Sequence, residues 1–502
     1  MKHFIGIDIG TYSSKGVLVD KQGTILSSFQ IKHDVMMPEK GWAEHDPEGT
    51  WWKEIVEITN ALLSESGCSP KNIEGLGIST IAPCVVPVDK NGKALRNAIL
   101  YGIDTRAYNE IEYLKGIIGE DEIIKRSGVD ISSQSCTPKI LWLKNNEPEI
   151  YKKTNYFLTG TGYINFRLTG NPSLDMYTSV GYPPLINIDN KRWDKTYEEL
   201  ITPIKKLPPI NWSCQKIGKI TQGAAKETGL LEGTPVITGT ADAAAEAISA
   251  GLRNTGDMMM MFGSSNFFIL KTTELMRTKE FWSANFIYPD SYVLTGGLAS
   301  CGSLIEWYKK QFTSQEKLLK INKNSEYAAL SELYEFSSAG ANGLVTLPYF
   351  AGERTPINNP KAKGIIFGLT LRHTKADIYR SLLESVGFGI RHNLDVLSLH
   401  NIIPKRIISV GGGTKNKLWM QTISDICNIT QHIPEKQIGA SYGDAFMAGV
   451  GVGILDPEKS LDEWVKIKEI IYPNEDVFNN YKKQFKIYKD LYETNKNLMK
   501  EI

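Results

Sequence analysis

The sequence predicts an α/β protein with two domains, and three observations support this prediction. The chain has 502 residues, which is more than one hydrophobic core normally holds. It opens with a buried strand, a turn of glycine and hydroxyl residues, and a second strand. The same order of elements returns at Met258–Phe262, Gly263–Asn266 and Phe267–Leu270, which indicates an internal duplication. We place the two domains at residues 1–247 and 248–502.

The opening segment of the chain is expected to be a three-stranded antiparallel meander. Phe4–Gly10 is the first strand, Thr11–Ser14 the turn, and Lys15–Asp20 the second strand, with Thr24–Ile31 as the third. Glycines allow a backbone to approach a phosphate group, and hydroxyl and amide groups can donate hydrogen bonds to it. The turn is therefore either a phosphate-binding turn or, like most turns of this composition, only a reversal of the chain.

Near the middle of the chain, one carboxylate stands among small residues. The strand Thr234–Thr238 runs directly into Gly239–Ala245, where nothing bulky covers Asp242. A carboxylate in such a place can accept a proton from a substrate hydroxyl. Asp is also a preferred N-terminal cap of a helix. The residues of this segment leave both interpretations open.

Further segments complete the expected architecture. Asp46 suits the N-terminal cap of a helix, and Pro47 its first turn; the helix then runs from about Glu48 to Ser64. The strand Arg406–Val410 ends in three glycines, residues 411–413, which permit either a ligand or a tight connection. We also expect two long helices, at Gly302–Phe312 and at Lys375–His400.

Composition excludes several classes of protein. The formal net charge is +1, so no overall field attracts nucleic acid or a membrane surface. The six cysteines are scattered without a Cys-x-x-Cys pair, which is typical of reduced thiols in a cytoplasmic protein. The N-terminus lacks the shape of a signal peptide, and the apolar run Phe446–Leu455 is too short to span a bilayer. A homodimer is the default expectation for an oligomer.

The chain resembles the FGGY carbohydrate kinases, which share the actin/hexokinase fold. The most specific match is Gly364–Leu369, followed after seven residues by Asp377–Glu384; together they fit the C-terminal signature of the family. The N-terminal signature is looser, because Lys139–Leu143 fits whereas Gln134 and Cys136 depart from it. The resemblance implies two duplicated ribonuclease H-like domains of the actin/hexokinase/Hsp70 type. A cleft would separate them, with the sugar on the N-terminal side and the nucleotide on the C-terminal side.

The resemblance also implies roles for individual residues. Asp242 matches the catalytic base, and Asp8 matches the carboxylate that holds the Mg²⁺ of the nucleotide. In phosphoryl transfer, alignment of the reacting groups and neutralisation of charge matter more than covalent chemistry. The implied ATP contacts are Thr11, Ser13, Ser14, Lys15, Gly263, Ser264, Ser265, Gly302, Gly412 and Asn416.

Within the family the chain looks most like xylulokinases, on the motif Gly352–Pro356, the glycines 411–413 and the tyrosine-rich tail. The loop Ile81–Cys84 replaces the Gln-Met-His-Gly stretch of those enzymes and lacks the Arg-Glu pair of glycerol kinases. The absence of the Arg-Glu pair argues against glycerol as the substrate, because a polyol site needs hydrogen-bond partners for the substrate hydroxyls. The expected reaction is ATP-dependent conversion of D-xylulose to D-xylulose 5-phosphate. The alternatives are another ketopentose, a polyol or gluconate as substrate, a non-catalytic binding protein, or an ATPase without a sugar substrate.

The expected contacts to the sugar are Trp42, Glu44, Asp104, Arg106 and Asp242. Three of these residues have a structural alternative. Trp42 can stack on a sugar face or belong to the core. Asp104 and Arg106 can bind hydroxyl groups or pair with each other at the start of a helix.

Overall fold

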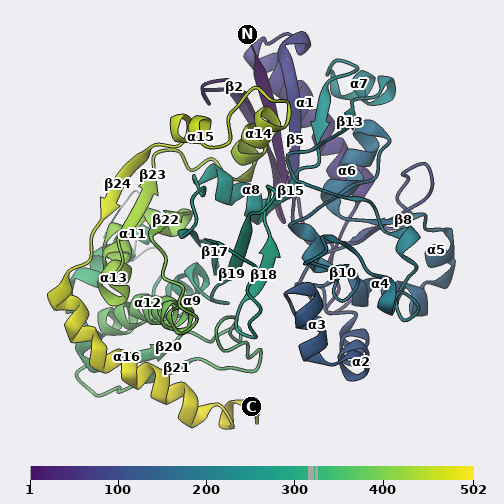
Figure 1. Cartoon of the computed structure of the whole chain (residues 1–502). Helices are drawn as coiled ribbons and strands as arrows, with labels where there is room; N and C mark the ends of the chain where they lie inside the picture. Colours follow the sequence, from purple (N-terminus) through teal and green to yellow (C-terminus); the bar gives the residue numbers. More distant parts are fainter. Residues whose placement is uncertain (1, 315–321, 323–325, 502) are drawn as a thin grey trace. The chain divides into compact units, whose positions relative to one another are not determined.

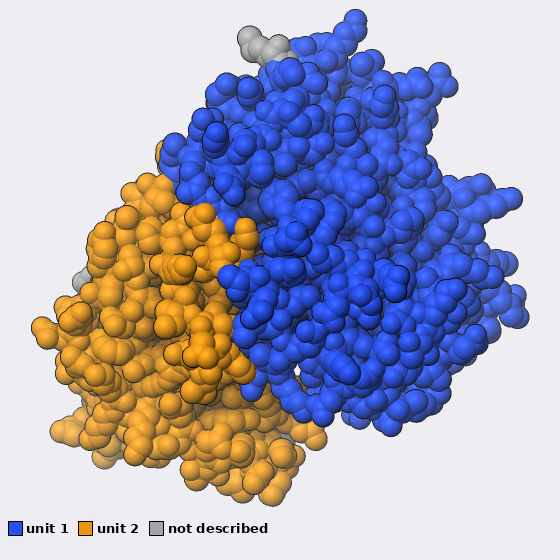
Figure 2. All heavy atoms as spheres, in the orientation of Figure 1, with its two compact units in different colours: residues 1–253, 272–294, 438–466 blue, residues 254–271, 295–437, 467–502 orange. Residues whose placement is uncertain are grey.

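The computed structural model describes residues 2–314, 322 and 326–501, which divide into two compact units (Figures 1 and 2). Unit 1 comprises residues 1–253, 272–294 and 438–466, and unit 2 comprises residues 254–271, 295–437 and 467–502. Unit 1 therefore contains two segments from the second half of the chain, whereas unit 2 is built from the second half alone. A domain boundary between residues 247 and 248 remains a prediction.

Unit 1 is built around a sheet with the order β13-β14-β5-β1-β2-β3, in which β15 also pairs with β5. The predicted meander is confirmed, because β1, β2 and β3 pair antiparallel in sequence order. The strands are β1 (His3–Ile9), β2 (Ser13–Asp20), β3 (Ile25–Lys32), β5 (Ile73–Thr80), β13 (Lys216–Lys219), β14 (Pro235–Ile237) and β15 (Thr240–Ala241).

Parallel pairing brings three strand ends of unit 1 to one edge of this sheet. In the pairing of β1 with β5, Asp8 lies opposite Ser79. In the pairing of β15 with β5, Thr240 lies opposite the same Ser79. Because the carboxyl ends of parallel strands share an edge, polar groups from distant parts of the chain meet there.

A helix lies unusually close to the same strands. A Cβ atom on Gly6 would stand 1.9 Å from the carbonyl oxygen of Ser441, and one on Gly77 would stand 2.3 Å from that of Asp444. Both contacts are with α14 (Ala440–Gly451), so only glycine fits at these two strand positions. This close packing places the buried Asp444 directly against the sheet.

Within unit 2, five strands follow the order β17-β16-β22-β23-β24. They are β16 (Asp257–Phe262), β17 (Asn266–Thr272), β22 (Arg406–Val410), β23 (Gln431–Pro434) and β24 (Ile467–Ile471). The predicted second strand–turn–strand unit is confirmed, because β16 and β17 form an antiparallel pair around residues 263–265. Since β16 runs parallel to β22, this turn and the glycines 411–413 leave the same edge of the sheet.

Each unit also contains helices and short strand pairs outside these sheets (Figure 1). In unit 1 the helices besides α14 are α1 (Lys53–Ser66), α2 (Tyr108–Ile118), α3 (Glu120–Ser127), α4 (Cys136–Asn146), α5 (Pro148–Lys153), α6 (Gly160–Thr169), α7 (Gln222–Thr228), α8 (Asp242–Ser249) and α15 (Lys459–Trp464). In unit 2 they are α9 (Gly302–Phe312), α11 (Glu326–Glu335), α12 (Lys375–Leu399), α13 (Lys417–Cys427) and α16 (Glu475–Asn495). The short pairs are β4 (Glu44–His45) with β7 (Ala98–Ile99), β6 (Val86–Val88) with β8 (Tyr156–Leu158), β9 (Leu174–Asp175) with β12 (Ile210–Asn211), β10 (Ile186–Asn187) with β11 (Arg192–Trp193), and β20 (Val345–Leu347) with β21 (Ile365–Phe367). The strands β18 (Trp282–Asn285) and β19 (Tyr292–Gly296) are neighbours in a larger sheet.

The C-terminal helix α16 belongs to the core of unit 2 rather than lying loosely on it. Its residues Tyr481, Phe485 and Tyr488 are buried and pack against a cluster that includes Val345 of β20. The hydroxyl of Tyr488 also accepts a hydrogen bond from that of Tyr349 at 2.9 Å. The recurring aromatics of the tail are thus explained by packing.

The cysteines agree with their sequence-based interpretation, because all six are free thiols. Across residues 2–314, 322 and 326–501, no helix combines the length and the apolar character needed to cross a bilayer.

Candidate active site

Asp242 is the first residue of helix α8, directly after strand β15. The N-cap position belongs to Ala241, and no side chain caps this helix end. Asp242 Oδ1 accepts a hydrogen bond of 2.8 Å from the backbone N–H of Ala243. The cap interpretation is therefore wrong by one position, and the half-buried carboxylate keeps its second oxygen for other partners.

The surroundings of Asp242 make it a better base than an exposed carboxylate. Burial raises its pKa to about 6, while the hydrogen bond from Ala243 opposes the shift. A general base is most effective when its pKa lies near the working pH. At neutral pH Asp242 is ionised, yet its affinity for a proton is higher than that of an ordinary aspartate.

Three further carboxyl groups lie around Asp242 in unit 1. Burial, reinforced by the charge of Asp242, raises the pKa of Asp8 well above its usual range. Glu246 follows one turn later on α8, and burial together with Asp242 raises its pKa to about 7. Asp444 is the third of these groups, and burial raises its pKa well above the usual range. The hydroxyl of Ser79 donates to both Asp8, at 3.1 Å, and Asp444, at 2.6 Å.

Lys15 supplies positive charge beside this acidic cluster. Its ammonium group donates a hydrogen bond of 2.6 Å to the carbonyl oxygen of Ile438. Burial lowers the pKa of Lys15, whereas the carboxylates of Glu246 and Asp8 raise it. A lysine held near a phosphate-binding turn can neutralise phosphate charge.

Asp8 fits the role of a magnesium ligand. Among residues 2–314, 322 and 326–501, no group of three or more His, Cys, Asp or Glu side chains is arranged to hold a metal ion. Mg²⁺ in phosphotransfer sites uses only one or two carboxylates and completes its shell with water and substrate phosphates. Burial is the main cause of the raised pKa of Asp8, and the negative charges of Asp242 and Glu246 add to it. A cation bound at Asp8 would offset both effects.

The first turn presents its predicted ATP contacts in different ways. The hydroxyl of Thr11 is within 3.0 Å of that of Tyr101, and Ser13 accepts a hydrogen bond from Gln30 at 3.0 Å. Ser14 is fully buried, and its hydroxyl donates to Glu54 at 2.5 Å. The side chain of Ser14 therefore points into the protein, although its contact to ATP remains a prediction.

The predicted nucleotide contacts of unit 2 fall in the second turn, at the start of α9 and just after β22. Gly302, the first residue of α9, donates a hydrogen bond of 2.9 Å to the carbonyl of Gly263. A Cβ atom on Gly302 would stand 2.7 Å from that oxygen, so the second turn and the helix start require a glycine here. Gly412 faces open space, and Asn416 caps α13 by accepting from Trp419 at 3.0 Å. Ser264 and Ser265 lie in the same turn as Gly263.

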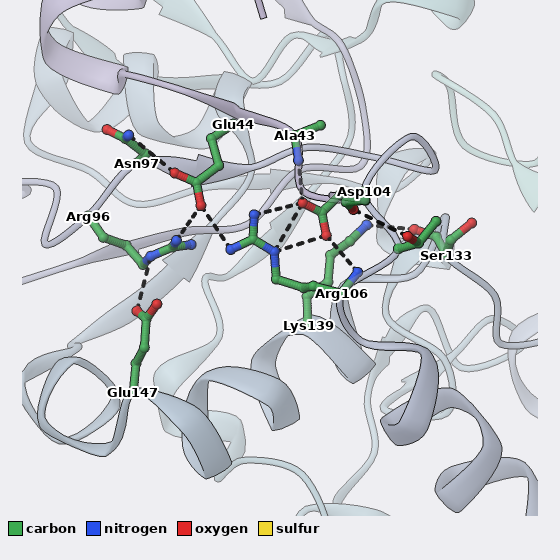
Figure 3. A network of polar contacts seen from close by, with 11 residues as sticks. Ala43, Glu44, Arg96, Asn97, Asp104, Arg106, Ser133, Lys139 and Glu147 are labelled. Atoms are coloured by element: carbon green, nitrogen blue, oxygen red, sulfur yellow. Dashed lines mark hydrogen bonds and ion pairs between the residues drawn. The ribbon is translucent and has the colours of Figure 1, made fainter. Parts of the chain in front are cut away.

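Three of the predicted sugar contacts, Glu44, Asp104 and Arg106, form a buried polar network (Figure 3). The guanidinium of Arg106 is fully covered and lies between Asp104, at 2.7 Å, and Glu44, at 2.8 Å. It also stacks over Trp42, with 3.9 Å between the guanidinium carbon and the ring centroid. The ion-pair alternative for Asp104 and Arg106 is therefore the one that the structure contains, and a role in sugar binding remains a prediction.

Residues that the sequence analysis did not single out extend this network. Arg96 bridges Glu44, at 2.5 Å, and Glu147, at 3.0 Å, while Asn97 donates to Glu44 at 3.2 Å (Figure 3). Asp104 accepts from the backbone N–H of Ala43 at 2.7 Å. Each carboxylate is thus matched by cations and N–H donors, as buried charges require.

Comparison with known proteins decides the family. The model of the N-terminal domain of the FGGY family of carbohydrate kinases matches residues 3–249, and the model of its C-terminal domain matches residues 258–452. The chain belongs to the FGGY family of carbohydrate kinases. This result confirms the family resemblance and the α/β fold class with two domains.

Relatives and solved structures extend the comparison over the full chain. A xylulose kinase of Bacillus subtilis is 28% identical, covering 99% of this kinase and 98% of the relative. The crystal structure of xylulose kinase from Rhodospirillum rubrum has a TM-score of 0.90 at 28% identity, covering 99% and 100% of the two chains. A gluconate kinase from Lactobacillus acidophilus reaches the same TM-score at 22% identity, with 98% of each chain covered, which indicates the fold alone.

Two tyrosines complete the surroundings of the candidate base in this kinase. Burial and the charge of Asp242 both raise the pKa of Tyr101 and of Tyr177. Neither tyrosine lies in a recognisable motif, so the sequence offers no signal for them. Glu246 could have been found from the sequence, because it follows Asp242 by four residues and such residues share one face of a helix.

Proposed function

We propose that this kinase transfers a phosphoryl group from ATP to D-xylulose, giving D-xylulose 5-phosphate. The observation that carries the proposal is Asp242, a half-buried carboxylate with a pKa of about 6 at the start of α8. Around it stand the acidic group of Asp8 and the ammonium of Lys15. These are a base, a metal ligand and a counter-charge for phosphate.

The proposed mechanism uses each of these groups once. Asp242 accepts the proton of the attacking hydroxyl, an effect worth roughly 10²–10⁴-fold in rate. Lys15 neutralises part of the phosphate charge, and the N–H groups of the first turn, residues 10–15, donate to phosphate oxygens. Mg²⁺, held by Asp8, would neutralise the charge that develops between the phosphates.

The polar groups around Asp242 favour an uncharged sugar over gluconate. An aldonate needs a cation for its carboxylate. Arg106 is fully covered by its own two carboxylates, and the buried ammonium of Lys139 donates to the carbonyl of Ser133 at 2.6 Å. The loop Ile81–Cys84 adds no charge. The hydroxyls of Tyr101 and Tyr177 instead suit a neutral polyhydroxyl compound.

The substrate is tested by ADP release with Mg·ATP and a panel of pentuloses, polyols, aldonates and glycerol. We expect the highest kcat/KM with D-xylulose and little response to gluconate or glycerol. A stronger response to another compound would keep the kinase and replace the substrate. ADP release without any sugar would instead indicate an ATPase.

Replacing Lys15 by methionine is expected to raise the KM for ATP by about 10- to 100-fold, because a hydrogen bond to a charged group contributes about 1.5–3 kcal/mol. The KM for the sugar should change little. The measurement is initial velocity against ATP at saturating sugar. Lys21→Met is the matched control, because Lys21 is an exposed lysine in the next turn of the same meander. An unchanged KM for ATP would remove Lys15 from the phosphate site.

A further inference from the structure

A buried charged pair lies directly behind the first phosphate-binding turn. His33 follows the end of β3, and its side chain is 7% exposed; Glu54 lies on α1 and its side chain is 8% exposed. The Nδ1 atom of His33 is 3.0 Å from one oxygen of Glu54 and 3.1 Å from the other. Both groups belong to unit 1 and neither takes part in the proposed chemistry.

Both ring nitrogens of His33 face acceptors. While Nδ1 meets the carboxylate, Nε2 is 3.1 Å from the carbonyl oxygen of Gly10. A neutral imidazole carries only one N–H, whereas the imidazolium carries two. The two contacts can therefore both be hydrogen bonds only when His33 is protonated. The carboxylate favours this form, and the pKa of His33 is raised despite burial.

The pair holds the turn at several points. The backbone N–H of His33 donates to the carbonyl of Tyr12 at 3.0 Å. Glu54, which fixes the ring, also accepts the hydroxyl proton of Ser14 at 2.5 Å. Gly10, Tyr12 and Ser14 span the whole turn, so its backbone is connected to one dyad.

The other titratable group that faces His33 stays neutral. His45 of β4 packs edge-on against His33, with 4.9 Å between the ring centroids. Its Nδ1 accepts from the indole N–H of Trp51 at 2.9 Å, which places its own proton on Nε2. Burial lowers the pKa of His45 to about 4. His45 therefore adds no charge beside His33 near neutral pH. Burial disfavours the charged ring of His33, whereas Glu54 and the backbone of Gly10 and Thr11 favour it.

We propose that the His33–Glu54 pair is a positioning dyad for the first phosphate-binding turn, and that loss of the His33 proton weakens the affinity for ATP. The inference rests on the proposed role of residues 10–15 in binding ATP phosphates. When His33 loses a proton, either the carbonyl of Gly10 or the carboxylate of Glu54 loses its donor. The turn then loses a fixed geometry that phosphate binding needs in advance.

The experiment measures the dissociation constant of ATP without sugar, by titration calorimetry of the full chain between about pH 5.5 and 9. His33→Gln, Glu54→Gln and wild type are compared, with His400→Gln as a control histidine at the end of α12. Wild type and His400→Gln should lose affinity by about tenfold as pH rises through the pKa of His33, the effect of one hydrogen bond to a charged group. His33→Gln should lack this step. Glu54→Gln should shift the step to lower pH, because the charge that favours the imidazolium is gone.

Nitrogen NMR of histidine-labelled protein provides a second readout that needs no turnover. The His33 signals, assigned by their absence in His33→Gln, should show two protonated ring nitrogens at about pH 6. One unprotonated nitrogen at that pH overturns the inference, and so does the same pH dependence of ATP binding in wild type and His33→Gln. The proposed function fails separately, if no compound of the sugar panel stimulates ADP release while ATP binding keeps its pH step.

Discussion

Replacement of Asp242 by asparagine should lower sugar-dependent turnover by at least about 100-fold, the lower limit of what a general base supplies. The asparagine amide has nearly the shape of the carboxylate. Its oxygen can still accept the hydrogen bond that the backbone N–H of Ala243 donates to Asp242. It cannot accept the proton of a sugar hydroxyl at neutral pH. The affinity for ATP should not weaken, because removing one negative charge near the phosphates does not oppose their binding.

The pH dependence of the reaction gives an independent check on Asp242. A base must be ionised, and the pKa of this carboxyl is about 6. In wild type, kcat/KM for the sugar should fall about tenfold per pH unit below that value. The residual activity of Asp242→Asn should lack this acidic limb. Glu246→Gln is the matched control, since it removes the neighbouring carboxylate on the same helix face and should keep the limb. Near-full activity of Asp242→Asn would remove this residue from the mechanism.

The fold could be predicted from the sequence where a local pattern specifies it. Short buried strands and turns of small polar residues were enough to predict the opening meander and its repeat at β16 and β17. The helix Gly302–Phe312 has the predicted bounds, and the second long helix ends at Leu399, one residue before the prediction. The local pattern could not predict which segments pack together: residues 438–466 belong to unit 1 although they lie between two segments of unit 2 in the sequence.

The residues of the candidate site likewise fall into those that a local motif predicts and those that only packing brings to the site. Residues at strand ends and in glycine turns, such as Asp8 and Gly263, are recognisable because a motif surrounds them. Asp444 and Glu54 reach the site only through packing of α14 and α1. For Asp104 and Arg106 the sequence left two interpretations open, because a charged pair two residues apart looks the same whether it faces a ligand or is buried.

Replacing Arg106 by methionine should destabilise the protein by about 3–5 kcal/mol, the range found when one partner of a buried ion pair is removed. The variant keeps an apolar side chain of similar length against Trp42 but leaves Glu44 and Asp104 covered without their shared cation. Urea denaturation followed by tryptophan fluorescence measures the effect, since Trp42 and Trp142 both lie within 5.1 Å of the Arg106 guanidinium.

Two control variants separate the buried charge from the loss of side-chain volume. Lys152→Met removes a cation from an exposed ion pair with Glu149 and should leave the urea midpoint unchanged, because such pairs contribute little. Arg106→Met combined with Asp104→Leu removes an uncompensated carboxylate as well, so it should recover part of the lost stability. A wild-type midpoint for Arg106→Met, together with a raised KM for the sugar, would contradict the structural role. The guanidinium would then act on the substrate, as the family resemblance implied, and the network in Figure 3 would be its resting arrangement.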